Sequence, residues 1–95
     1  MKTQTITLKL KLKLKHYSSP CHGWVKVENA LMVTLGIISK ISSYSFRSDT
    51  HWMIEEDSDA RILINALKAA GIEYEIEGIE KPNRAFLNNY KRVGD

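Results

Sequence analysis

Apolar and polar residues alternate along two segments of the chain. In residues 3–16, isoleucine and leucine side chains fall on one face, and threonine and lysine side chains fall on the other. Residues 72–79 alternate in the same way, with Ile72, Tyr74 and Ile76 on one face and glutamates on the other. A period of two residues is typical of a strand that buries one face. The pattern therefore predicts that these segments are the first and last strands of a sheet.

Two other segments have the spacing of a helix. Apolar residues recur three and four positions apart within residues 57–70, which begin with the N-cap candidates Asp57 and Ser58. A shorter helical pattern starts after Glu28 and stops at Gly36. Aspartate and serine favour helix starts, and glycine favours the left-handed position that follows a helix. We predict a helix over residues 57–70 and a shorter one that ends before Gly36.

The region between the two helices has the pattern of a hairpin. Residues 41–47 and 51–55 read as strands, and the polar residues 48–50 between them read as a turn. Residues 17–23 are expected to form a loop after the first strand. Residues 24–27 form either a short strand or an extended lead into the first helix.

The order of these elements predicts the fold class. Strand, helix, strand, strand, helix, strand is the order of an α+β, ferredoxin-like βαββαβ sandwich, with one antiparallel sheet and two helices on one face. A chain of 95 residues has room for about one domain. We expect residues 1–80 to form this domain. Residues 81–95 are expected to form a basic C-terminal tail that is disordered or loosely docked.

Charge is divided into blocks along the chain. The net charge is +3, yet residues 1–27 carry lysines and no acid, residues 28–80 are acidic, and residues 81–95 are basic again. The first and last strands of a ferredoxin-like sheet are antiparallel neighbours, so their lysine and glutamate faces would lie side by side. These faces consist of Lys9, Lys11, Lys13 and Lys15 on the first strand and Glu73, Glu75 and Glu77 on the last. We favour cross-strand pairing for these lysines. The alternatives are a charged edge that discourages aggregation and a nucleic-acid surface.

Residues that could carry catalysis are sparse. The candidates are His16, Cys21, His22 and His51, and their spacing matches neither a familiar zinc pattern nor a cysteine–histidine pair. The glycine-rich phosphate loops and the metalloprotease helix motif are missing from the sequence. The sequence therefore predicts a protein that is not an enzyme and that uses no metal and no cofactor.

The sequence also carries an expectation about the compartment. Cys21 is the single cysteine, no apolar run approaches about 18 residues, and the N-terminus lacks the apolar stretch of a secretory signal. We expect a cytoplasmic protein without membrane contact.

Four short segments resemble a group of small phage- and plasmid-encoded proteins of unassigned function. They are His22-Gly23-Trp24, residues 41–45, residues 55–60 and residues 67–72. The resemblance implies a mobile-element setting, in which small single-domain proteins such as anti-CRISPR proteins act by binding a host machine. It carries no assigned catalytic residues.

The first functional hypothesis is a binding protein that occludes a site on a host protein or nucleoprotein complex. Its candidate contacts are Tyr17, His22 and Trp24 in the loop after the first strand, and Arg47 and Asp49 at the hairpin tip. Loops on a rigid scaffold often carry such contacts, and Trp, Tyr and Arg are enriched in binding hot spots.

The alternative hypothesis is a nucleic-acid-binding protein. Its candidate contacts are the lysine stripe and the basic tail, namely Lys9, Lys11, Lys13, Lys15, Arg84, Tyr90, Lys91 and Arg92. Either function is compatible with a homodimer that forms through a free edge of the first strand.

Overall fold

A computed structural model describes residues 11–95 of the protein. The chain runs through β1 (Leu12–Ser18), β2 (Gly23–Glu28), α1 (Asn29–Leu35), the 3-10 helix η1 (Ile38–Lys40), β3 (Phe46–Arg47), β4 (His51–Glu55), α2 (Ala60–Ala69), β5 (Tyr74–Glu80), the 3-10 helix η2 (Ala85–Leu87) and β6 (Lys91–Arg92). Lys9 and the rest of the alternation within residues 1–10 lie outside the described residues.

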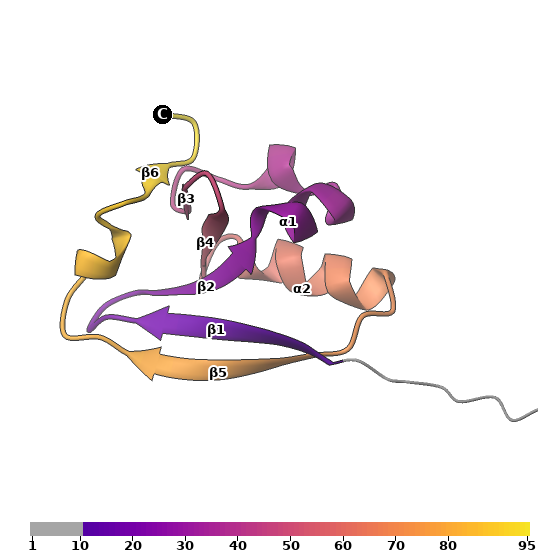
Figure 1. Cartoon of the computed structure of the whole chain (residues 1–95), viewed down its shortest axis with the longest axis horizontal. Helices are drawn as coiled ribbons and strands as arrows, with labels where there is room; N and C mark the ends of the chain where they lie inside the picture. The colour runs from indigo at the N-terminus through magenta and orange to yellow at the C-terminus, as the bar shows by residue number, and fades with distance from the viewer. Residues whose placement is uncertain (1–10) are drawn as a thin grey trace, which may run out of the picture.

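The strands form one mixed, six-stranded sheet in the order β5-β1-β2-β4-β3-β6 (Figure 1). β1 pairs with β2 in antiparallel orientation and with β5 in parallel orientation. The remaining neighbours in the sheet are antiparallel. The prediction of an α+β fold with two helices is therefore confirmed.

The predicted ferredoxin-like strand order is not found, and the predicted antiparallel pairing of the first and last strands is wrong. Residues 23–28 form a complete strand, β2, which reverses the chain before the first helix begins. In a ferredoxin-like sheet, the strand before the first helix would pair directly with the strand after the second helix, and these strands are β2 and β5 here. β1 instead lies between them. The charged faces still meet, because the parallel register places Lys13 beside Glu75 and Lys15 beside Glu77.

Both helices pack on one face of the sheet. Met32 of α1 and Leu63 and Leu67 of α2 join Val27 and Ile54 of the strands in one buried cluster. Alternation along each strand places these strand residues on the same side of the sheet. α1 ends as predicted, since Gly36 has a left-handed φ of 67° and its N–H donates to the carbonyl oxygens of Met32 and Val33.

The strand predicted over residues 41–47 is reduced to the two residues of β3, Phe46 and Arg47. The residues before it are held by the carboxylate of Asp59, which precedes α2. That carboxylate accepts hydrogen bonds from the N–H and hydroxyl of Ser42 and from the hydroxyl of Ser45. These bonds hold the serine-rich segment beside the start of α2, and its regular pairing with β4 is limited to Phe46 and Arg47.

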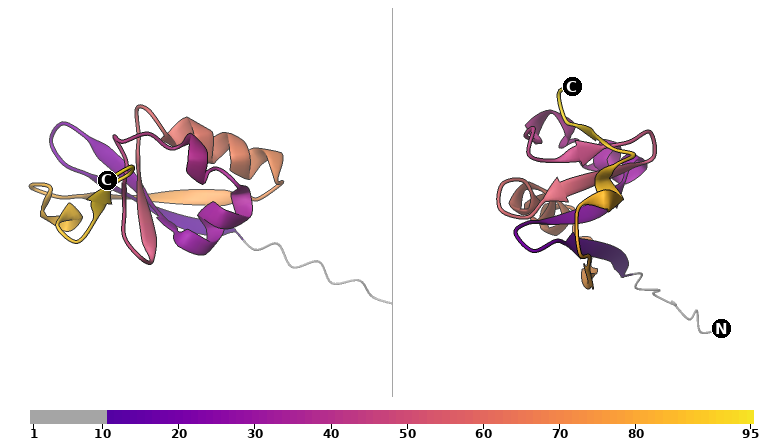
Figure 2. Two further views of the ribbon diagram at one scale, coloured as in Figure 1. Left: turned by 90° about the horizontal axis from the view of Figure 1, so that it is seen from above. Right: turned by 90° about the vertical axis from the view of Figure 1, so that its left-hand side faces the viewer.

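Residues 81–95 were predicted as a disordered or loosely docked tail. In the structure they return across the sheet from β5 to β3 (Figure 2). The segment forms η2, in which Leu87 is buried, and then β6, which pairs with β3. In Figure 2 (right) it climbs from the end of β5 toward the C-terminus near β3. Within residues 11–95, none of the helices has the length and apolar character that crossing a bilayer requires.

Candidate functional site

The face of the sheet opposite the helices carries aromatic and basic side chains, and we call it the second face. Register places Tyr17 opposite Trp24, Lys15 opposite Lys26, and Lys26 opposite Met53. Because alternate residues of a strand share a side, these side chains lie together on the second face. No α-helix covers this face among residues 11–95, and the C-terminal segment packs on part of it.

Trp24 lies at the centre of an aromatic cluster on the second face. Its ring centroid is 5.8 Å from that of Phe86 and 6.1 Å from that of Phe46, both in edge-to-face geometry. Tyr17 stacks on Phe86 with their centroids 5.5 Å apart. Trp24, Met53 and Leu87 are buried in this cluster. The C-terminal segment is thus attached to the sheet through aromatic contacts, and these are energetically favourable beyond the area they bury.

Basic side chains lie over these rings. The guanidinium of Arg84 is 5.1 Å from the Trp24 ring centroid, and that of Arg92 is 5.3 Å from the Phe46 centroid. Arg92 also donates to the carbonyl oxygen of Ser43 at 3.1 Å. Cation–aromatic contacts restrict an arginine without neutralising its charge. Both guanidiniums are therefore held in place and remain charged.

A hollow of about 390 Å³ opens beside these two arginines. It is lined by His22, Trp24, Tyr44, Phe46, Glu55, Asp57, Ser58, Arg84 and Arg92. Tyr44 is 64% exposed at this hollow, and its carbonyl oxygen accepts a hydrogen bond from the Trp24 indole at 3.3 Å. The hollow therefore presents an exposed tyrosine, two arginines and the Asp57 carboxylate to solvent.

Glu55 forms one wall of this hollow and is buried. Its carboxylate accepts hydrogen bonds from the N–H groups of Asp57 and Ser58 and from the Ser58 hydroxyl. Burial raises the pKa of this carboxyl, but the hydrogen bonds from Ser58 and Asp57, together with nearby His22, lower it by more. The net result is a pKa below its ordinary value of 4.5.

The lowered pKa of Glu55 predicts an acid-sensitive contribution to stability. The folded state favours the ionised carboxylate, so the contribution is full above pH 4.5 and is lost as the pH falls through the folded-state pKa. We expect Glu55→Gln to unfold with a weaker pH dependence than the wild type between about pH 6 and pH 3. Urea unfolding of both proteins across this range measures the difference. Parallel pH curves for the two proteins would contradict the assignment.

Three potential metal ligands meet in the same hollow. Donor atoms of His22, Glu55 and Asp57 lie within 4.8 Å of one another. The Glu55 carboxylate already caps the turn before α2, and Arg84 and Arg92 line the same hollow. Two nearby guanidiniums repel a divalent cation. Both observations argue against a divalent cation at these three ligands.

The other titratable residues singled out in the sequence do not share a site in the described part of the chain. His16 Nε2 lies 2.8 Å from Glu56 Oε2, His51 Nδ1 lies 2.8 Å from the Thr50 hydroxyl, and Cys21 is exposed. The two histidines are engaged with different neighbours, and among the described residues these three side chains form neither a nucleophile–base pair nor a shared metal site.

The predicted protein-binding residues are divided between two places. Tyr17 and Trp24 belong to β1 and β2 and not to a loop, and Trp24 is only 2% exposed, so its expected place in a surface loop is wrong. The error arose because residues 23–28 continue the sheet and turn the indole into the second face. His22 lines the hollow, whereas Arg47 and Asp49 line a separate polar hollow of about 580 Å³ at the hairpin.

Only some of the predicted nucleic-acid-binding residues lie on one surface. Lys13 and Lys15 lie on the second face, and Lys11 is exposed just before β1. The Lys13 ammonium is 4.0 Å from a Glu75 carboxylate oxygen, with both side chains exposed. An exposed pair of this kind contributes about 0–1 kcal/mol.

The basic residues of the C-terminal segment divide in the same way. Arg84 and Arg92 join the second face, and Tyr90 packs against its aromatic cluster. Burial, with Tyr17 nearby, raises the pKa of the Tyr90 hydroxyl. Lys91 lies at the hairpin, opposite Arg47.

Sequence reasoning missed several residues of the second face. Tyr44, Phe46 and Phe86 were not singled out as site residues, although all three are aromatic and near basic residues in the sequence. Lys26 and Lys81 were missed as well, and their ammonium groups lie 6.0 Å and 5.7 Å from the Tyr17 ring centroid. The pairing of residues 23–28 with β1 was the missing information, since it brings Tyr17 and Trp24 together.

Comparisons with protein-family models, with curated proteins and with solved structures found no significant match to this chain. Function must therefore be inferred from the chain's own residues and their arrangement.

Proposed function

We propose that this protein is a small, non-enzymatic binding module that occludes a site on a host protein or nucleoprotein complex, for example a CRISPR defence complex. The observation that carries this proposal is the hollow on the second face, where Arg84 and Arg92 lie on aromatic rings beside exposed Tyr44. Arginine, tryptophan and tyrosine are the residue types most enriched in binding hot spots.

The fixed arginines favour a partner that offers an acidic side chain. A guanidinium that is already held against a ring loses little conformational freedom when it binds a carboxylate in bidentate geometry. Glu55 and Asp57 in the same lining disfavour a second acid beside them, which adds selectivity. The resemblance to mobile-element proteins suggests that such a contact acts by steric occlusion.

Nucleic-acid binding is the second candidate, because Lys13, Lys15 and Lys26 share the second face with Arg84 and Arg92. Two observations rank it lower. Non-specific binders of single strands stack bases on exposed rings, whereas the Trp24 ring is buried and Arg84 lies over it. Glu75 and Glu77 also lie beside the β1 lysines and reduce their field.

The test of the binding proposal is affinity capture from a lysate of the source cell with three forms of the protein. The wild type and the control Lys68→Ala, which alters an exposed residue on α2 away from the second face, should capture the same partner. The double variant Tyr44→Ala/Arg84→Ala should retain about a tenth or less of that partner, since hot-spot residues cost more than about 1 kcal/mol each. Equal capture by all three forms would reject the second face as the binding site.

Fluorescence anisotropy with single-stranded and duplex oligonucleotides separates the two candidates. We expect no binding at micromolar protein in about 50–200 mM salt. Tight binding that weakens steeply over this range would favour nucleic-acid binding over the protein-binding proposal.

A further inference from the structure

β1 has an unpaired edge near its N-terminal end. Its ladder with β5 begins at Leu12, but its ladder with β2 extends only as far as the pair Lys15 and Lys26. β2 passes into α1 at Asn29 and leaves the neighbouring position along β1 open. Among residues 11–95, no strand is paired with β1 on this side at Leu12–Leu14.

The backbone of this edge can accept another strand. The Leu12 N–H donates to the Glu73 carbonyl at 2.9 Å, and the Ser18 carbonyl accepts from the Lys81 N–H at 2.7 Å. Backbone groups of successive strand residues point to opposite sides. Even-numbered residues of β1 therefore face β5, and the N–H and C=O of Lys13 face the open edge.

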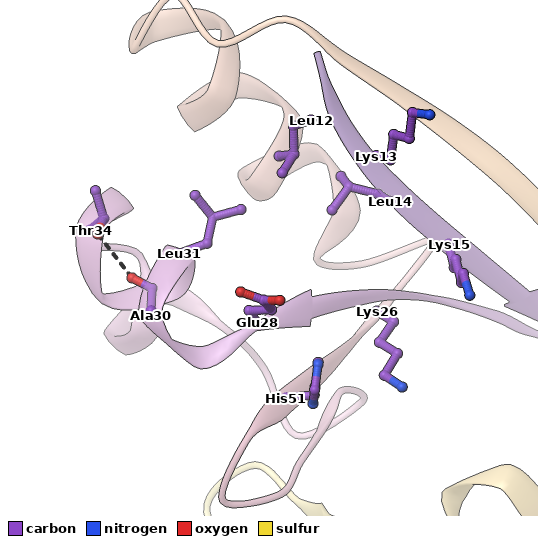
Figure 3. Close-up of a pocket in the computed structure, with 10 residues that line it drawn as sticks. All are labelled: Leu12, Lys13, Leu14, Lys15, Lys26, Glu28, Ala30, Leu31, Thr34 and His51. Carbon is purple, nitrogen blue, oxygen red and sulfur yellow. Dashed lines mark hydrogen bonds between the residues drawn. The ribbon is translucent and has the colours of Figure 1, made fainter. Parts of the chain in front are cut away.

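A hollow of about 590 Å³ lies along this edge (Figure 3). On the helix side it is lined by apolar groups, with Leu12 and Leu14 of β1 facing Leu31 of α1. Lys13, Lys15 and Lys26 lie around its other side. Glu28 is the one acidic residue in the lining, which also includes His51. Glu75 and Glu77 offset part of the charge of Lys13 and Lys15 from the β5 side, whereas the register partners of Lys26 are Lys15 and Met53.

We propose that the open edge of β1 binds an extended acidic peptide segment of a partner protein as an added strand. A segment that alternates apolar and acidic residues would place its apolar side chains against Leu14 and Leu31 and its carboxylates near Lys13, Lys15 and Lys26. Its backbone would pair with the N–H and C=O of Lys13. The site is separate from the hollow beside Tyr44 and does not depend on the function proposed for it.

Charge disfavours a second copy of this chain as the occupant. Residues 1–10 contain Lys2 and Lys9 and no acid, so a second copy would bring cations to a cationic edge. Like charges placed side by side on paired strands are destabilising.

The test is fluorescence anisotropy with a labelled peptide of about six residues that alternates valine and glutamate. We expect it to bind the full-length protein, and we expect the matched valine–lysine peptide to bind at least about tenfold more weakly. The variant Lys13→Gln removes the charge but keeps the N–H, and it should weaken binding a few-fold. The variant Lys13→Pro also removes the N–H that faces the edge, without removing a bond to β5, and should weaken binding at least about tenfold further.

Two further measurements keep the result decisive. A peptide methylated on alternate backbone nitrogens tests strand pairing without changing the protein, and it should not bind if the glutamate peptide adds as a strand. The Tyr44→Ala/Arg84→Ala variant should bind the glutamate peptide like the wild type, which separates this site from the second-face hollow. Equal binding of the two charged peptides, full binding of the methylated peptide, or self-association of the protein that Lys13→Pro abolishes would each overturn the proposal.

Discussion

Trp24→Ala is expected to lower the free energy of unfolding by about 3–5 kcal/mol, which is the usual cost of emptying a buried tryptophan site. Trp24 is 2% exposed and contacts Phe46 and Phe86 through its ring. Its indole N–H also donates to the Tyr44 carbonyl. Because a small domain is stable by only about 5–15 kcal/mol, this loss would remove a large part of its stability. Thermal unfolding should show a midpoint at least about 12 °C below that of the wild type.

Tyr44→Ala is the matched control for this experiment. Tyr44 is 64% exposed, so truncating its side chain should change the unfolding free energy by less than about 0.5 kcal/mol. The two variants therefore separate the core of the second face from its contact surface. A Trp24→Ala protein as stable as Tyr44→Ala would mean that the indole does not hold the C-terminal segment to the sheet.

Asp59→Ala is expected to have the second largest effect, a loss of about 3 kcal/mol. The carboxylate is 2% exposed and accepts hydrogen bonds from the Ser42 N–H, the Ser42 hydroxyl and the Ser45 hydroxyl. Hydrogen bonds to charged groups are stronger than those between neutral groups, and their loss leaves buried donors unsatisfied. Urea unfolding of the variant gives the loss directly.

Two further variants test whether Asp59 acts through the serines. Asp59→Asn keeps an acceptor of similar shape and should lose less stability than Asp59→Ala. Adding Ser45→Ala to Asp59→Ala should cost less than the sum of the two single changes, because both changes remove the same bond. If the losses of the two single variants added up in the double variant, Asp59 would stabilise the fold by a route other than its bond to Ser45.

Alternation within residues 12–16 and 74–77 was sufficient to predict β1 and β5 as strands. The meeting of their charged faces was predicted from the ferredoxin-like strand order, and it occurs in a sheet with a different order. The direction of the pairing was not predictable, because a period of two residues assigns side chains to faces and carries no information about strand orientation. β2 was uncertain for a different reason. It is buried on both faces, so Trp24 and Val25 are both apolar and the alternation is weak.

The candidate site was harder to predict than the fold. The residue types were found, since His22, Trp24, Arg84 and Arg92 all line the hollow. Their grouping was not, because it depends on the C-terminal segment returning across the sheet to β3. That return is driven by packing of Phe86 and Leu87, two apolar residues in a segment without a clear period. Contacts between residues so distant in sequence leave no local pattern.

The position of β1 between β2 and β5 has a consequence for how the chain reaches its folded state. β1 is synthesised before its parallel partner, which spans residues 74–80, and the segment that packs on the second face follows later still. Parallel pairs between distant segments form slowly, because the entropy of closing a long loop is lost before the strand contacts form. On the ribosome, the β1–β2 hairpin would therefore wait with one side of β1 unpaired until β5 emerges. During that interval the lysines of β1 would disfavour association with the same strand of a neighbouring nascent chain.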